Sequence, residues 1–198
     1  MSLNVLVLAE DITYDQHLVC PVVRQAFAAL GQPRAKVRPC LDPRFGGYSQ
    51  ATESETLSDV YWRYSGAIDL FILAVDRDGE PGRADRLAQL EEEARDAGTS
   101  LIGVAAHQEI EAWALAGLPE FKPRNYGFAS WPAVRRERDV KEAAFEPFAL
   151  DQRAQFGVGG GRKRLGEAAA RRYAGRIRVK CAEVATFEQR LSDWLASR

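Results

Sequence analysis

The chain is poor in cysteine, with only three among 198 residues. Cys20, Cys40 and Cys181 lie far apart and form no C-x-x-C pair. This pattern argues against a zinc knuckle and against a disulfide framework. The N-terminal apolar run has no basic segment before it and stops at Glu10, too early for a signal peptide or a membrane span. We therefore expect a cytoplasmic protein with reduced thiols and no membrane partner.

The chain also lacks a dominant charge, because 27 Lys and Arg residues stand against 28 Asp and Glu residues. The overall charge therefore predicts neither nucleic acid nor a membrane surface as a partner, and any such preference must come from local patches. There is no internal repeat, and the only low-complexity stretch is the glycine-rich segment 157–161. A hydrophobic content of 46% suffices for one sizeable core and at most two small domains.

What the sequence does contain is an alternation of strand-length apolar runs with helical patterns, which is typical of a parallel sheet with crossover helices. The predicted strands are 3–9, 35–40, 67–75 and 100–106. Nearly every residue of 67–75 is apolar, as expected for a strand covered on both faces. Helical patterns run from Val19 to Leu30, with Pro21 in the first turn and Gly31 at the end, from Leu57 to Tyr64, and from Leu87 to Ala94.

The pattern changes after Pro119, where aromatic and proline residues follow one another without a clean period. Helical patterns return near 133–145, 163–176 and 182–196. We predict an α/β core at 1–118, followed at 119–198 by an irregular connection and a helical extension that packs on the core as one compact unit.

Acidic residues follow two of the predicted strands. Glu10 and Asp11 follow the first strand, and Asp76 and Asp78 follow the third, two apart in a segment that we expect to be extended, so that they point to the same side. Ligands of an open parallel sheet bind beyond the carboxyl ends of its strands. If these two strands are neighbours, Glu10, Asp76 and Asp78 meet in one crevice. Crowded carboxylates require a cation, and hard oxygen ligands suit Mg²⁺ or Mn²⁺.

The segment HQEIEAWALAG (107–117) follows the fourth strand and predicts a helix that contributes Glu109 and Glu111. Two residues apart on a helix, these side chains diverge by about 200°. We therefore expect one of them, with a slight preference for Glu111, to complete the acidic cluster. His107 either assists a metal or a proton transfer, or simply begins the helix.

The order of these acids resembles the Toprim superfamily, the metal-binding catalytic domain of topoisomerases, primases and OLD-type nucleases. The segment EIEAWALA within 107–117 and KCAEVATFEQRL (180–191) are similar to small stand-alone Toprim-like proteins of bacterial defence genes, related to the OLD and RloB-like groups. The resemblance implies a Rossmann-like Toprim fold with a central parallel sheet of about four strands flanked by helices, plus a helical C-terminal extension. Asp11 stands where Toprim proteins often carry a glycine after the first glutamate.

The same resemblance implies roles for the acids. Glu10 would be the general acid or base, Asp76 and Asp78 the metal ligands, and Glu109 or Glu111 the further acid. It also implies a role in bacterial defence against phage, and it leaves open a partner ATPase or another defence subunit and a homodimer.

The segment 162–180 is rich in basic residues, because it contains eight Lys and Arg residues and a single acid, Glu167. Binding of a nucleic-acid backbone and a solvated helix face explain this segment equally well. The predicted nucleic-acid contacts are Arg162, Lys163, Arg164, Arg171 and Arg172. The preceding GVGGG lacks the order of a P-loop, and a flexible linker is its expected role.

We expect a Mg²⁺- or Mn²⁺-dependent nuclease that cleaves phosphodiesters. Its predicted catalytic residues are Glu10 and Glu111, and its predicted metal ligands are Glu10, Asp76, Asp78, Glu109 and Glu111. A haloacid-dehalogenase-like phosphatase is an alternative because an apolar strand precedes D-x-D-G, although the threonine and the downstream lysine of that family are missing. A non-catalytic metal-binding or receiver-like module is another alternative, although the expected lysine after 100–106 is absent.

Overall fold

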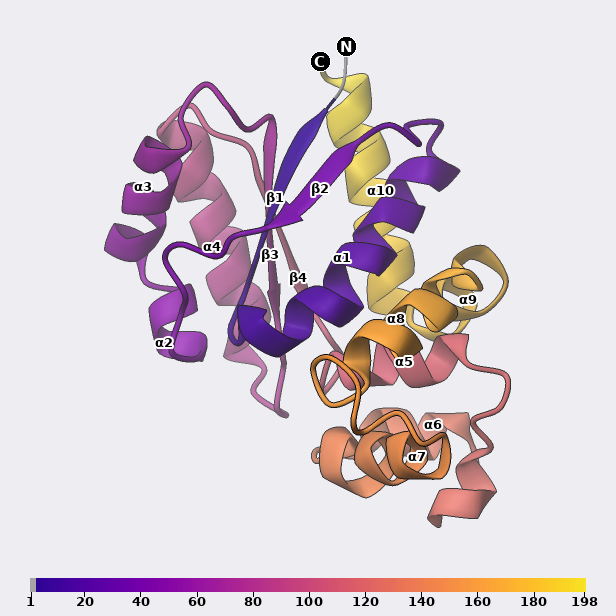
Figure 1. Ribbon diagram of the computed structural model, residues 1–198. Helices are drawn as coiled ribbons and strands as arrows, with labels where there is room; N and C mark the ends of the chain where they lie inside the picture. The colour runs from indigo at the N-terminus through magenta and orange to yellow at the C-terminus, as the bar shows by residue number, and fades with distance from the viewer. Residues whose placement is uncertain (1–2) are drawn as a thin grey trace.

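The computed structural model describes residues 3–198 as an α/β fold built on a four-stranded, all-parallel sheet (Figure 1). The strands are β1 (Asn4–Ala9), β2 (Lys36–Pro39), β3 (Leu70–Val75) and β4 (Leu101–Ala105). Their order across the sheet is β2-β1-β3-β4. The predicted α/β class with about four parallel strands is confirmed, and the arrangement is consistent with a Rossmann-like fold.

Strands β1 and β3 are neighbours, as the clustering of acids required. Ala9, the last residue of β1, lies opposite Ala74, so the two strands end side by side. Alternate residues of β1 enter two different cores, with Val7 on one face of the sheet and Leu8 on the other. Because both faces are covered, β1, β3 and β4 are nearly continuous apolar runs, whereas the edge strand β2 is partly exposed.

Helices cover both faces of the sheet (Figure 1). One face packs against α1 (Ile12–Ala29) and α10 (Ala182–Ala196). The other face packs against α3 (Ser54–Arg63) and α4 (Gly82–Asp96), with the short α2 (Tyr48–Ala51) before them. Over residues 3–198, every helix is too short or too polar to cross a membrane.

Helix α1 begins earlier than the sequence pattern predicted. It starts at Ile12, only two residues after Glu10, and Pro21 lies in its middle rather than in its first turn. The early turns were missed because an acid, Asp15, occupies a buried position between Ile12 and Leu18 and interrupts the apolar period. The early start brings Asp15 close to the end of β1.

The second half of the chain is helical and packs at the carboxyl ends of the strands, on the α1 side of the sheet (Figure 1). Its elements are α5 (Glu111–Gly117), a 3₁₀ turn (Pro123–Tyr126), α6 (Trp131–Arg136), a π-helical turn (Lys141–Phe145), α7 (Glu146–Asp151), α8 (Arg162–Ala170), a second π-helical turn (Tyr173–Ile177) and α9 (Arg178–Lys180). The helices predicted at 133–145 and 163–176 are each broken into shorter pieces. Buried side chains of this half, such as Phe145 and Leu165, share one core with β1.

Helix α8 packs unusually close to α1 and α5. A Cβ atom at Gly166 would lie 2.1 Å from the carbonyl oxygen of His17, and one at Gly117 would lie 2.7 Å from the Ala169 oxygen. Because only glycine permits such an approach, these two residues hold α8 against the helices that follow β1 and β4.

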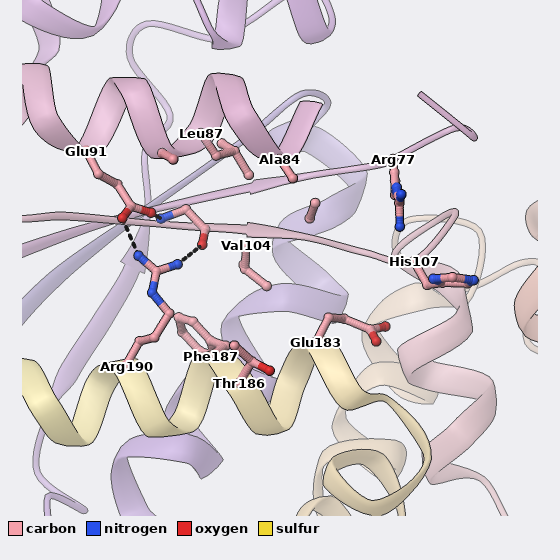
Figure 2. A pocket seen from close by; sticks show the side chains of 13 residues that line it. Arg77, Ala84, Leu87, Glu91, Val104, His107, Glu183, Thr186, Phe187 and Arg190 are labelled. Atoms are coloured by element: carbon pink, nitrogen blue, oxygen red, sulfur yellow. Dashed lines mark hydrogen bonds and ion pairs between the residues drawn. The ribbon is translucent and has the colours of Figure 1, made fainter. Parts of the chain in front are cut away.

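The outer edge of β4 is closed by two side chains (Figure 2). Glu91 of α4 accepts a hydrogen bond from the Gly103 N–H at 2.6 Å, and Arg190 of α10 donates one to the Gly103 carbonyl at 2.8 Å. Glu91 and Arg190 also form an ion pair with each other beside a pocket of about 420 Å³. We call this pair the edge clasp. It occupies the hydrogen-bonding groups that an added strand would use.

Candidate metal centre

An acidic cleft of about 790 Å³ opens beyond the carboxyl ends of β1, β3 and β4. Seven of its lining residues are acidic and two are basic. The acids are Glu10, Asp11, Asp15, Asp76, Glu109, Glu111 and Glu146, and the bases are Lys141 and Arg162. Such an excess of carboxylates favours binding of a cation.

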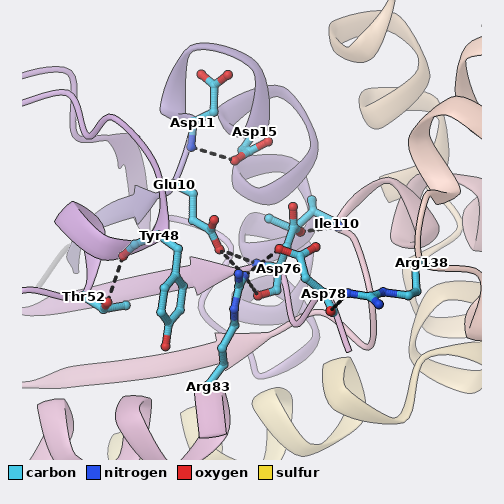
Figure 3. Close-up of polar contacts among 10 residues, drawn as sticks. All are labelled: Glu10, Asp11, Asp15, Tyr48, Thr52, Asp76, Asp78, Arg83, Ile110 and Arg138. Carbon is cyan, nitrogen blue, oxygen red and sulfur yellow. Dashed lines mark hydrogen bonds and ion pairs between the residues drawn. The ribbon is translucent and has the colours of Figure 1, made fainter. Parts of the chain in front are cut away.

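Glu10 connects the ends of the two central strands (Figure 3). Its Oε1 atom accepts a hydrogen bond from the Asp76 backbone N–H at 2.8 Å and lies 3.4 Å from Nη1 of Arg83. Burial raises the pKa of Glu10 above its ordinary value, although the Asp76 N–H and Arg83 oppose the shift. Glu10 and Asp76 therefore lie side by side at the ends of neighbouring strands and line one cleft.

Asp76 is the first residue beyond β3 and points into the cleft toward the start of α5. Its Oδ1 atom accepts a hydrogen bond from the Ile110 backbone N–H at 2.8 Å. Burial raises the pKa of Asp76 well above its ordinary value, and the charges of Glu111, Asp15 and Glu10 raise it further. This carboxyl group is crowded by other acids, so a cation beside it would favour its ionised form.

Asp78 lies near Asp76 and Glu109, but a turn places it there rather than the predicted extended segment. Its φ of 49° lies in the left-handed region, and the N–H groups of Arg77 and Asp78 both point to the Gln108 carbonyl, at 2.8 and 3.3 Å. The D-x-D-G motif is thus a turn bound to the loop after β4. Oδ2 of Asp78 lies 2.8 Å from Nη1 of Arg83.

Glu109 lies in the turn before α5 rather than on the helix, which begins at Glu111. Its Oε2 atom accepts a hydrogen bond from the Lys141 N–H at 2.6 Å. Burial raises the pKa of Glu109 to about 7, against the effect of the Lys141 N–H, and the charge of Glu111 adds to the shift. The expected angle of about 200° between the side chains of Glu109 and Glu111 assumed that both lie on one continuous helix. Because Glu109 precedes the helix, that angle gives no reason to choose between the two glutamates.

Asp76, Asp78 and Glu109 form the group best suited to a metal ion. Each offers one carboxylate oxygen, and these oxygens lie within 4.8 Å of one another. All three are partly buried. Carboxylate oxygens are the donors that hard divalent cations prefer. Burial, together with neighbouring acids, raises the pKa values of Asp76 and Glu109, and a bound cation would favour the ionised form of both groups.

Glu111, the preferred further acid of the sequence analysis, is outside this group. It is only 4% exposed, and its Oε1 atom accepts hydrogen bonds from Nε and Nη2 of Arg162 at 3.1 and 2.6 Å. Arg162 is itself 6% exposed. Arg162, which was predicted to bind nucleic acid on a helix surface, is therefore the buried ion-pair partner of Glu111, a predicted catalytic residue.

The glycine-rich segment brings Arg162 into the cleft. Gly159, Gly160 and Gly161 all have positive φ, and a Cβ atom at Gly161 would lie 2.7 Å from the Ala154 carbonyl oxygen. A tight turn in this conformation requires glycine. The predicted flexible linker is instead a packed turn that begins α8.

Two further residues of the site escaped the sequence analysis. Asp15 is 8% exposed, and burial raises its pKa to about 7, with the charge of Glu111 adding to the shift. Arg83, in the first turn of α4, contacts both Glu10 and Asp78 and donates to the Asp76 carbonyl at 2.6 Å. The only signal for Asp15 was its place in the apolar period of α1, and no local motif marked Arg83.

The remaining predicted residues lie outside the cleft. Lys163, Arg164, Arg171 and Arg172 are exposed on α8 and just after it. His107 lines the pocket beside the edge clasp, where burial and the nearby Arg135 lower its pKa (Figure 2).

Comparisons with known proteins give no further guide, since no family model, no curated protein and no solved structure matches this chain.

Proposed function

We propose that this chain is a Mg²⁺- or Mn²⁺-dependent, Toprim-like nuclease that cleaves phosphodiester bonds of nucleic acid. The observation that supports this function best is the group of Asp76, Asp78 and Glu109, whose oxygens lie within 4.8 Å at one edge of a parallel sheet. Acids that follow β3 and β4 meet there, next to Glu10 after β1. Ligand sites of open parallel sheets lie at this edge.

In this proposal Asp76, Asp78 and Glu109 hold the ion. When bound, the ion supplies Lewis-acid polarisation of the scissile phosphate and a lowered pKa for the attacking water. Glu10 accepts or donates the proton, since its carboxyl group lines the cleft and burial holds its pKa above the ordinary value. Arg83 orients Glu10 and Asp78 through contacts at 3.4 and 2.8 Å.

We assign Glu111 a positioning role in place of direct catalysis. Its carboxylate is paired with Arg162 on two nitrogens, which holds the guanidinium at the wall of the cleft. Arg162 is only 6% exposed and its three nitrogens donate to Glu111 and to the Gly159 carbonyl, so this pair shapes the wall of the cleft and leaves phosphate contacts to more exposed cations.

Nucleic acid is the proposed substrate because exposed basic side chains continue from Arg162 along α8. Lys163, Arg164, Arg171 and Arg172 form this basic surface. Neutralisation of backbone phosphates by such residues supplies most non-specific affinity for nucleic acid. The resemblance to stand-alone Toprim-like proteins adds a proposed role in phage defence in the cytoplasm, with a partner ATPase or another defence subunit and a homodimer as the assemblies to look for.

The test is calorimetric titration of Mg²⁺ and Mn²⁺ into the wild type and into the double variant Asp76→Asn with Asp78→Asn. The matched control replaces two exposed acids of α4, Glu92→Gln with Asp96→Asn. We expect the wild type and the control to bind metal and to cut plasmid, single-stranded DNA or RNA. The Asp76→Asn, Asp78→Asn variant should do neither.

The proposal would be overturned if the wild type binds no metal, or if the Asp76→Asn, Asp78→Asn variant still cleaves nucleic acid. Hydrolysis of a small phosphomonoester without any cleavage of nucleic acid would indicate a phosphatase instead. Metal binding without hydrolysis of either substrate would indicate a non-catalytic metal-binding module.

A further inference from the structure

A large aromatic side chain is presented to solvent from the segment that leads into Gly160 and Arg162 of the cleft wall. Phe156 is 90% exposed and lies in the segment 152–161 that connects α7 to α8. Val158, two residues further along, is also an exposed hydrophobic residue. Burying such a side chain is favourable by about 1.5–3 kcal/mol, so a ligand that covers the Phe156 ring gains this free energy.

The segment 152–161, which we call the aromatic turn, is tied by backbone hydrogen bonds. The Gly157 N–H donates to the Ala154 carbonyl at 2.8 Å, and the Lys163 N–H donates to the Val158 carbonyl at 3.3 Å. The side chain of Arg164 also donates to the Gln152 carbonyl. These bonds fix both sides of Phe156 in the chain, so the ring is presented from a defined backbone.

The segment that carries Phe156 is basic in sequence and lies between the acids Asp151 and Glu167. No Asp or Glu occurs between residues 152 and 166. Arg153, Lys163 and Arg164 are all exposed around the aromatic turn. A purely apolar protein interface would be depleted of charge at its centre, whereas an aromatic ring among exposed cations matches the chemistry of a nucleotide, with a flat base and an anionic phosphate.

The aromatic turn is continuous with the cleft. Gly160 lines the cleft, and so does Arg162, which directly follows the turn. A Cβ atom at Gly159 would lie 2.8 Å from Cδ2 of His17 in α1, so the turn packs directly against the helix that follows β1. The segment that carries Phe156 therefore ends at the wall of the cleft.

We infer that the aromatic turn binds an unpaired nucleotide of single-stranded nucleic acid. The base stacks on Phe156, and the flanking phosphates contact Arg153, Lys163 and Arg164. Duplex is disfavoured because its bases are already stacked and their faces are inaccessible to a side chain. This inference rests on the proposed function for the identity of the substrate, and it adds a preference for single strands or frayed ends.

The experiment is fluorescence anisotropy with labelled oligo-dT and with a labelled duplex of equal length, in EDTA so that no cleavage occurs. The variants are Phe156→Ala, Phe156→Trp and Phe156→Leu. The matched control is Trp62→Ala, which removes an aromatic residue that is 83% exposed on α3, on the opposite face of the sheet.

We expect Phe156→Ala to weaken oligo-dT binding by about 5- to 150-fold, as found for the loss of one base–aromatic stack. Phe156→Trp should restore the affinity, because stacking needs a flat ring, and Phe156→Leu should not. Duplex binding and the Trp62→Ala variant should be unchanged. Lys163→Ala with Arg164→Ala should reduce the slope of log affinity against log salt.

Unchanged oligo-dT affinity in Phe156→Ala, or full affinity in Phe156→Leu, would overturn the inference. A change of oligomeric state in Phe156→Ala, measured by sedimentation, would also overturn it and would assign the ring to an interface between copies of the chain. If the wild type cleaves nucleic acid while Phe156→Ala binds and cleaves normally, this inference alone fails. If the wild type binds no nucleic acid, both proposals fail.

Discussion

Arg162 and Glu111 form a buried ion pair in which Nη2 of the arginine lies 2.6 Å from Oε1 of the glutamate. The guanidinium also lies over the rings of Phe145 and Tyr14, with its carbon 5.1 and 5.3 Å from the ring centroids. The first residue of α8 thus neutralises the first residue of α5. The pair connects the helical extension to the site.

We predict that Arg162→Ala destabilises the protein by about 3–5 kcal/mol, because removing one partner leaves the Glu111 charge buried without compensation. Urea unfolding measures the change. Lys163→Ala is the control, since this neighbour is exposed and its loss should cost less than about 0.5 kcal/mol. Equal midpoints for the two variants would show that the ion pair does not stabilise the fold.

Asp15 should make stability depend on pH. Burial raises its pKa in the folded protein to about 7 from an ordinary value of 3.8, so the folded state favours the protonated acid. The contribution of protonated Asp15 to the free energy of unfolding is therefore fully present below about pH 4 and is lost as the pH rises through about 7.

Asp15→Asn cannot titrate and keeps an oxygen that can accept the Asp11 N–H bond. In EDTA we expect this variant to be more stable than the wild type at pH 8, by at most about 4 kcal/mol at about 1.4 kcal/mol per pKa unit, and equal to it near pH 4. Chemical unfolding at the two pH values measures this difference. A difference that does not change with pH would contradict the prediction.

The edge clasp should limit self-association. The double variant Glu91→Ala with Arg190→Ala frees the N–H and carbonyl of Gly103 at the edge of β4, and such groups are open to pairing with another strand. We expect a larger average mass or faster aggregation than in the wild type, measured by sedimentation velocity. The control is Glu92→Ala with Arg95→Ala on the exposed side of α4, and equal masses for the two double variants would refute the idea.

Gly166→Ala should loosen the contact between α8 and α1. Its added Cβ would lie 2.1 Å from the His17 carbonyl oxygen, so the helices must separate, at an expected cost of about 1–3 kcal/mol. Gly175→Ala is the matched control, since nothing lies within 4 Å of its added Cβ. Thermal unfolding should distinguish the two, and identical melting temperatures would show that α8 accommodates the methyl group without loss.

Much of the fold was predictable because β1, β3 and β4 are short apolar runs with both faces buried. The four predicted runs each contain an observed strand, and β1 and β3 end beside each other as the acids suggested. Helix boundaries were less predictable. Helix α5 begins at Glu111 instead of His107, so Glu109 lies in the turn before it. Glu109, rather than the preferred Glu111, is the glutamate that lies near Asp76 and Asp78.

The strands and the acids that follow them could be predicted from the sequence, because they depend on local hydrophobic runs and chain order. The pairing of β1 with β3, which makes Glu10 and Asp76 neighbours, and the choice of carboxylates that lie together depend on the tertiary fold. Arg162, distant in the sequence, pairs with Glu111 and removes it from the group, while a turn brings Asp78 to Asp76 and Glu109. Pairing of buried charges depends on contacts between distant segments, and no local pattern of residues encodes those contacts.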